Sequence, residues 1–286
     1  ISDPGYPVRI EDIDGDGHFE VLAISHPADG RGEKYRFHGF SRTGQLRWSF
    51  AREGDIAFGA TTYASPFLAR HIHLTPRDGG GSNIWLVSNH RPWFPSVMSK
   101  MEFDGRVSAE YWSAGYIARV WEGMVAGRRV VLAAARNNES GGASLAMLDA
   151  ANPSGAAPAE QARYQCRTCP SGAPIRFVKM PRPARLLPLG GTANVMRIEV
   201  SGGSRVVVWV RPTYDADQGV GPEVIYTFDA ELRPLSVGLS DTFDAGVRAL
   251  ASRGLIPAPP STPSIDEFRA VRWWDGARFV DLAVPK

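Results

Sequence analysis

The chain has 286 residues, of which 43% are hydrophobic, and a formal net charge of +2. This length suits one large β domain or two smaller domains, and the apolar content is sufficient for a sizeable core. The small net charge excludes bulk attraction to nucleic acid or anionic lipid, and no apolar run has the length of a membrane span. With 30 glycines and 22 prolines, the composition favours many short strands joined by turns. Because the chain begins at Ile1 rather than Met, we expect a processed mature chain or a fragment.

The first unit, residues 5–50, has the pattern of a four-stranded antiparallel meander. Strands are predicted, in order, over residues 8–10, 21–26, 35–41 and 46–50. A meander of roughly 40–50 residues has the length of one propeller blade. The loop between its first two strands, residues 12–20, carries the strongest chemical signal in the sequence.

Oxygen donors occupy alternate positions of this loop. They are the side chains of Asp12, Asp14, Asp16 and Glu20 and the backbone carbonyl of His18. Calcium is a hard cation that takes about six to eight oxygen ligands, and this spacing is typical of a calcium loop. Gly15 and Gly17 permit the positive φ values of so tight a turn. An EF-hand is excluded, because its last loop position needs a bidentate glutamate and is here Ala23 within a strand. We therefore predict one structural calcium ion, and the alternative is an acidic turn without metal.

The segment from Asp12 to Val21 resembles the calcium signature of FG-GAP/VCBS repeats, the β-propeller blades also found in integrin α subunits. In that family the pattern D-x-D-G-D-G-x-x-[DE]-[ILV] links two strands of one blade, and this segment matches it nearly completely. The resemblance covers this one unit directly. It implies a β-propeller, calcium binding by the loop and an adhesion-like or scaffold role, and it does not identify a partner.

Two further units repeat the rhythm of the first without its aspartates. Residues 56–112 form a looser copy, in which the turn 78–83 takes the place of the calcium loop. The hairpin turn at residues 104–105 matches the earlier turn at 43–44, and this internal repetition favours a propeller over a sandwich. Residues 115–150 form a third copy, in which the loop has shrunk to a bare turn.

Residues 151–190 break the repeat and contain both cysteines, Cys166 and Cys169. Their C-x-x-C spacing also occurs in redox motifs, half zinc sites and haem attachment sites. Haem attachment needs a histidine where Pro170 lies, zinc needs further ligands, and a redox motif should open a helix. We therefore predict a small structural disulfide within an irregular excursion that holds one or two short strands, such as 175–179. A disulfide agrees with an extracytoplasmic location, where oxidising conditions and millimolar calcium occur together.

The chain returns to strands over residues 193–240, which form a fourth unit. Residues 241–253 carry apolar side chains at helical spacing and are predicted to form the one short helix. Residues 268–284 then form a hairpin that either completes an incomplete blade or packs on a neighbour. Together the units predict an all-β fold, a single β-propeller domain over residues 1–286 with about five four-stranded blades, the last within 241–286.

Other candidate sites carry weaker patterns. His71 and His73 lie on one face of a strand and offer half of a metal site or, alternatively, cross-strand polar contacts or a solvated face. A proline-stiffened aromatic loop offers a ligand or partner surface, or else packs over the core. Its candidate residues are His90, Arg91, Trp93 and Phe94. The sequence has no serine-hydrolase, zincin, P-loop or dinucleotide-binding motif.

We therefore predict a non-catalytic, extracytoplasmic, calcium-binding propeller that serves as a protein-interaction or scaffold subunit of an envelope or surface complex. The expected partners are other proteins, with carbohydrate as a further candidate, and neither nucleic acid nor a membrane span is expected. One alternative is a polysaccharide lyase or hydrolase, with His71, His73, His90 and Arg91 as its candidate residues. The other is a carbohydrate-binding module that stacks sugars on exposed tryptophans.

Overall fold

The computed structural model describes residues 7–25, 35–90, 94–183, 193–212, 222–257 and 265–285. His26, at the end of a predicted strand, and Arg91 and Trp93 of the aromatic loop lie outside these residues. Strands dominate the described chain, and α1 (Phe243–Ser252) is its one α-helix. No helix within these ranges is long and apolar enough to cross a membrane. The all-β class and the single short helix are therefore confirmed.

The main strands form successive up-and-down antiparallel sheets. The first sheet contains β1 (Val8–Glu11), β2 (Glu20–Ser25), β3 (Arg36–Phe40) and β4 (Leu46–Phe50). The second contains β7 (Leu68–Pro76), β8 (Ser82–Asn89), β9 (Ser96–Met101) and β10 (Val107–Ser113). Each strand pairs with the one before it, which is the arrangement of a propeller blade.

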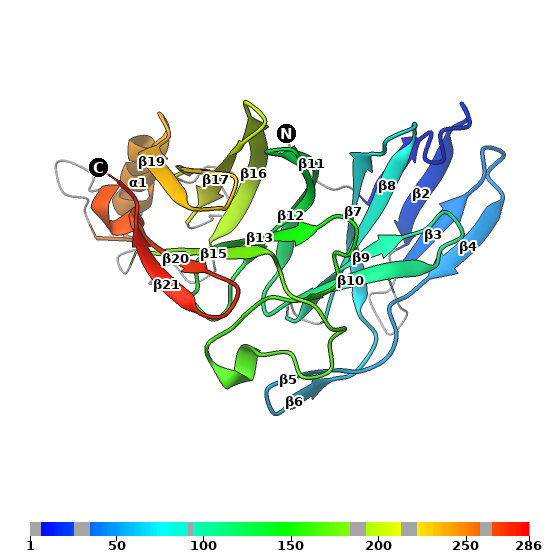
Figure 1. Ribbon diagram of the computed structural model, residues 1–286, viewed down its shortest axis with the longest axis horizontal. Coiled ribbons are helices and arrows are strands. Elements are labelled where there is room, and N and C mark those ends of the chain that lie inside the picture. The colour runs from blue at the N-terminus through cyan, green and yellow to red at the C-terminus, as the bar shows by residue number, and fades with distance from the viewer. Residues whose placement is uncertain are drawn as a thin grey trace.

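Two more sheets follow along the chain. The third contains β11 (Ile117–Val125), β12 (Arg128–Arg136), β13 (Ala143–Asp149) and β15 (Arg176–Met180). The fourth contains β16 (Asn194–Ser201), β17 (Arg205–Arg211), β18 (Val224–Phe228) and β19 (Pro234–Leu239). Figure 1 shows the sheets side by side, from the blue first sheet on the right to the yellow fourth sheet on the left. The fold is therefore propeller-like, with four such meanders in the described residues.

The C-terminal hairpin corrects the expected number of about five blades. It consists of β20 (Ala270–Trp274) and β21 (Phe279–Ala283), and β20 pairs with β15. The strand predicted within the irregular excursion is thus the fourth strand of the third sheet. An edge strand has unpaired backbone N–H and C=O groups that another strand can bind. At the edge of β15 these groups pair with β20. The third sheet has six strands as a result.

The remaining elements are short. They are β5 (Ile56–Phe58) and β6 (Thr61–Tyr63), which form a hairpin; β14 (Gly155–Ala156), which adds to β10 in parallel; and the 3-10 helices Ala162–Tyr164 and Ile265–Phe268. The helix α1 buries Phe243, Val247 and Leu250 on one face, as its apolar spacing predicts.

Apolar side chains fill the spaces between neighbouring sheets. In β17, Val206, Val208 and Val210 are buried while the residues between them are partly exposed, the period of two expected of a half-buried strand. In β12 the run from Val130 to Ala135 is buried throughout, because the third sheet has neighbours on both faces. Three clusters join the first sheet to the second, the second to the third and the third to the fourth.

Candidate metal centre and neighbouring sites

Asp12 organises the loop between β1 and β2. Its carboxylate accepts hydrogen bonds from the backbone N–H groups of Gly15 at 2.8 Å, Asp16 at 3.1 Å and Gly17 at 2.9 Å. The φ angles of Gly15 and Gly17 are 83° and 85°, a region that disfavours any side chain. Because the flanking strands pair in antiparallel register, both ends of this tight loop are fixed.

Three carboxylates converge in the loop. One oxygen each from Asp12, Asp14 and Glu20 lies within 4.8 Å of the other two. Two oxygens that bind one calcium ion at about 2.4 Å lie at most about 4.8 Å apart, so this spacing fits a shared calcium ion. The Ile13 N–H donates to Glu20 Oε2 at 3.1 Å and holds that carboxylate in place. Three carboxylates this close repel one another unless a cation lies between them.

Asp16 and His18 lie outside this group of three. Asp16 Oδ1 accepts the His18 N–H at 2.8 Å, and both residues are exposed. The His18 Nε2 atom is 2.9 Å from Arg42 Nη1, on the turn between β3 and β4. Ligation by the Asp16 carboxylate and by the His18 carbonyl therefore stays a prediction.

The candidate metal loop also packs on the second sheet, which the sequence did not indicate. The Ser82 N–H donates to the Ile13 carbonyl at 2.9 Å, and Arg77 Nη2 donates to the Asp14 carbonyl at 2.8 Å. A Cβ at Gly81, where φ is 75°, would lie 2.4 Å from the Ile13 oxygen, so this close approach requires glycine. The Gly-rich turn between β7 and β8 therefore supports the candidate metal loop of the first sheet.

A polar cleft of about 610 Å³ opens between the second and third sheets. At its base lies Glu122 of β11, whose side chain is 2% exposed. Its carboxylate accepts hydrogen bonds from Thr75 Oγ1 at 2.8 Å, Asn83 Nδ2 at 2.8 Å and Arg129 Nε at 3.0 Å. Trp85 Nε1 contributes a further contact at 3.3 Å. A buried charge is stable when it is paired and its lone pairs are satisfied, as here.

Sequence reasoning missed this network, although one signal was present. Glu122 lies two residues after Val120, which is fully buried, and so occupies a core-facing position of a strand. Its partner Arg129 also contacts Asp78, and the hydrogen bonds that Arg129 donates to Asp78 and Glu122 raise the pKa of its guanidinium. Residues from four strands (β7, β8, β11 and β12) and one turn thus form a single polar and ionic network.

The two candidate histidines of β7 do not form a metal site. The His71 Nε2 atom shares a short hydrogen bond with the Tyr116 hydroxyl, and His73 is fully buried with its ring centroid 6.2 Å from that of His71. Within the described ranges, the three side chains that lie close enough together to share a metal ion are Asp12, Asp14 and Glu20 of the candidate metal loop. Neither histidine belongs to this set. A polar contact with Tyr116 is therefore the observed role of His71, while His73 packs inside the fold beside it.

Stability is expected to fall as the pH drops from 6.5 towards 4. Burial, with a contribution from Arg119 and Arg70, lowers the pKa of His71 from 6.5 to about 4. Between these values the unfolded chain binds a proton that the folded chain does not, so acid favours unfolding. Urea unfolding measured across this range tests the effect. The variant His71→Gln should show a shallower pH dependence than the wild type, and an equal dependence would contradict the assignment.

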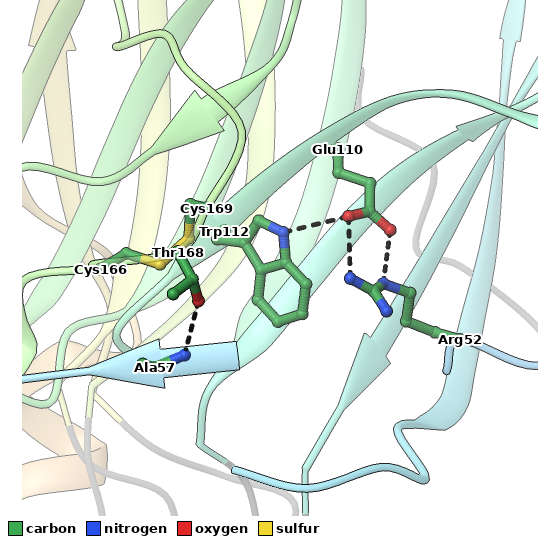
Figure 2. Close-up of a disulfide and its surroundings, with 7 residues drawn as sticks. All are labelled: Arg52, Ala57, Glu110, Trp112, Cys166, Thr168 and Cys169. Carbon is green, nitrogen blue, oxygen red and sulfur yellow. Dashed lines mark hydrogen bonds and ion pairs between the residues drawn. A yellow bond between two sulfur atoms is a disulfide. The ribbon is translucent and has the colours of Figure 1, made fainter. Parts of the chain in front are cut away.

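The predicted disulfide between Cys166 and Cys169 is confirmed. It lies beside β5, where the Ala57 N–H donates to Thr168 Oγ1 at 2.9 Å (Figure 2). Phe58 also forms an isolated β-bridge with Cys166. The disulfide loop is thereby attached to the β5–β6 hairpin, so the bond pins a loop as expected.

An ion pair beside the disulfide completes this region (Figure 2). Arg52 Nε lies 2.7 Å from Glu110 Oε1, and Trp112 Nε1 donates to Glu110 Oε2 at 3.2 Å. The Arg52 guanidinium also stacks 5.2 Å from the Trp112 ring centroid. These contacts join the segment before β5 to the last strand of the second sheet.

Replacing Cys166 and Cys169 together with alanine is expected to lower the free energy of unfolding by at most about 2 kcal/mol. The reason is that the cysteines are three positions apart, so the bond closes a short loop and removes little entropy from the unfolded chain. Urea unfolding of this variant, beside the oxidised wild type, measures the difference. Loss of the folded state altogether would contradict a role confined to pinning one loop.

The described part of the aromatic loop packs against the same hairpin. The Tyr63 ring centroid lies 5.3 Å from that of His90 and 5.1 Å from that of Phe94, and Phe94 lies 5.4 Å from Phe58. All of these ring contacts are edge-to-face, a favourable geometry. His90 and Phe94 are therefore half-buried parts of a small aromatic cluster.

No known protein family and no curated protein sequence matches this chain. Among solved structures, it is similar to one titled "Structure of Dos1 propeller", with 10% sequence identity and a TM-score of 0.30. The alignment covers 93% of this chain and 67% of the other. At this level of similarity the match supports no argument about function.

Proposed function

We propose that the chain is a non-catalytic, extracytoplasmic scaffold of the FG-GAP/VCBS type that binds one structural calcium ion. The observation that carries the calcium assignment is the convergence of Asp12, Asp14 and Glu20 within 4.8 Å of one another. The role of the ion is to neutralise these carboxylates and hold the loop that leads into β2. The disulfide supports an oxidising compartment, where calcium at millimolar concentration keeps even a weak site filled.

The scaffold role is supported by the way the fold is built. Successive antiparallel sheets, packed through apolar clusters, leave their turns and edges as broad surfaces for other proteins. None of the tryptophans placed within the described ranges is fully exposed, so they offer no obvious platform for stacking sugars. We therefore place protein partners ahead of carbohydrate.

Metal analysis of the purified protein tests the calcium part of the proposal directly. After equilibrium dialysis against calcium, elemental analysis is expected to find one ion per chain in the wild type and none in Asp14→Ala. Affinity purification of the tagged chain from its native source, with identification of what elutes, tests the scaffold part. Zero calcium in the wild type would refute the metal site, and recovery of the chain alone would count against the scaffold role.

A further inference from the structure

The cleft between the second and third sheets carries an excess of positive charge. Four cationic side chains and three carboxylates line it. Arg129 contacts both Asp78 and Glu122, and Arg128 lies 3.5 Å from Asp149. Two arginines thereby engage all three carboxylates, and two further cations face the same space.

These two cations are Arg77 and Lys100, and aromatic rings position both. The Arg77 guanidinium stacks 4.6 Å from the Phe103 ring centroid, and Lys100 Nζ lies 5.6 Å from that of Trp85. Within the part of the chain that the structure describes, neither makes an ion pair with a carboxylate, and Lys100 Nζ makes no hydrogen bond. Stacking on an aromatic face holds a cation without satisfying its N–H donors, so the Nζ donors of Lys100 stay available to a ligand. Arg77 donates from Nε and Nη2 to backbone carbonyls and keeps Nη1 for a ligand.

The ionic network beneath them makes the site rigid. Glu122 is buried and bonded to groups on β7, β8 and β12, so the base of the cleft is fixed by both sheets. Arg77 is held in turn by the carbonyls of Asp14 and Gly80, at 2.8 Å and 3.1 Å. A ligand therefore meets cations that are already in place, which reduces the entropy lost on binding.

We propose that this cleft binds an acidic peptide segment of a partner protein, with carboxylates contacting Lys100 and Arg77. The proposal rests on the scaffold role above and names the chemistry of the partner. A volume of about 610 Å³ accommodates a few residues, within the usual range of ligand sites. Among the residues that the structure describes, no aromatic side chain lines the cleft, and these residues offer no stacking surface that would favour a sugar.

Fluorescence anisotropy with a fluorescein-labelled hexaglutamate peptide in low-salt buffer tests this assignment. The wild type is expected to bind, with affinity that falls as salt is added, and Lys100→Gln to bind about tenfold more weakly because one charge-assisted contact is lost. The matched control is Arg205→Gln, which removes the same charge from an exposed position on β17, outside the cleft. Thermal melting of both variants verifies that they fold.

Four results would overturn the proposal. The first is no binding of hexaglutamate by the folded wild type. The second is an equal loss of affinity in Lys100→Gln and Arg205→Gln, which would indicate unspecific attraction. The third is tighter, Lys100-dependent binding of an oligogalacturonate, which would assign the cleft to acidic sugars. A partner that copurifies equally well with Lys100→Gln would leave the scaffold role intact while removing the cleft from it.

Discussion

Replacing Glu122 with alanine is expected to lower the free energy of unfolding by about 2–3 kcal/mol, as measured by urea denaturation. The substitution removes an acceptor of Thr75, Asn83 and Trp85. It also takes one of two carboxylate partners from Arg129, which keeps Asp78. The buried Thr75 hydroxyl loses its acceptor and cannot turn to water instead, so the cost of its desolvation appears, while Asn83 and Arg129 line the cleft and are less affected. The apolar volume left behind adds to the loss.

The control for this prediction is Glu102→Ala. Glu102 is partly exposed, and its side chain makes no hydrogen bond or ion pair within the described residues, so we expect a change below about 0.5 kcal/mol. Glu122→Gln keeps the shape of the side chain and one acceptor oxygen. Its loss of unfolding free energy should therefore lie between those of Glu102→Ala and Glu122→Ala. If Glu122→Ala were no less stable than Glu102→Ala, the network would not be a stabilising feature of the fold.

Removing calcium with a chelator is expected to lower the melting temperature of the wild type by about 5 °C. An ion that binds only the folded chain stabilises it by about 2.7 kcal/mol when its concentration is a hundredfold above the dissociation constant. The ion is expected to act at Asp12, Asp14 and Glu20, whose mutual repulsion reappears once it is removed. Differential scanning calorimetry with calcium and with chelator measures the shift.

Two variants show whether the shift belongs to this loop. Asp14→Ala should melt at one temperature with or without chelator, because a ligand is missing. Asp241→Ala removes an exposed aspartate next to α1 and should keep the full response to chelator. Identical melting curves for the wild type in calcium and in chelator would exclude a stabilising metal.

The features that the sequence predicts correctly are local ones. The strand pattern, the helix over Phe243–Ser252 and the disulfide each depend on residues close together in the chain. The convergence of Asp12, Asp14 and Glu20 is local for the same reason, because a nine-residue loop brings them together. Periodicity and spacing suffice where few residues separate the interacting groups.

The features that were missed depend on contacts between distant segments. No pattern in β15 indicates that β20 will pair with it, because the two strands are separated by the whole fourth sheet. The network around Glu122 draws on β7, β8 and β12, and the cleft above it exists only when two sheets pack together. A single charged residue at a core-facing position indicates that a partner exists, without saying where.

One guanidinium connects the two proposed binding events. Arg77 lines the cleft and also donates a hydrogen bond to the carbonyl of Asp14, a residue of the metal loop. A cation that orders this loop therefore also fixes Arg77, one of the groups that would contact an acidic segment. Thermodynamic reciprocity then requires that a bound acidic segment increase the affinity of the loop for the cation by the same factor. The candidate metal loop and the cleft would then report on each other's occupancy through a single side chain.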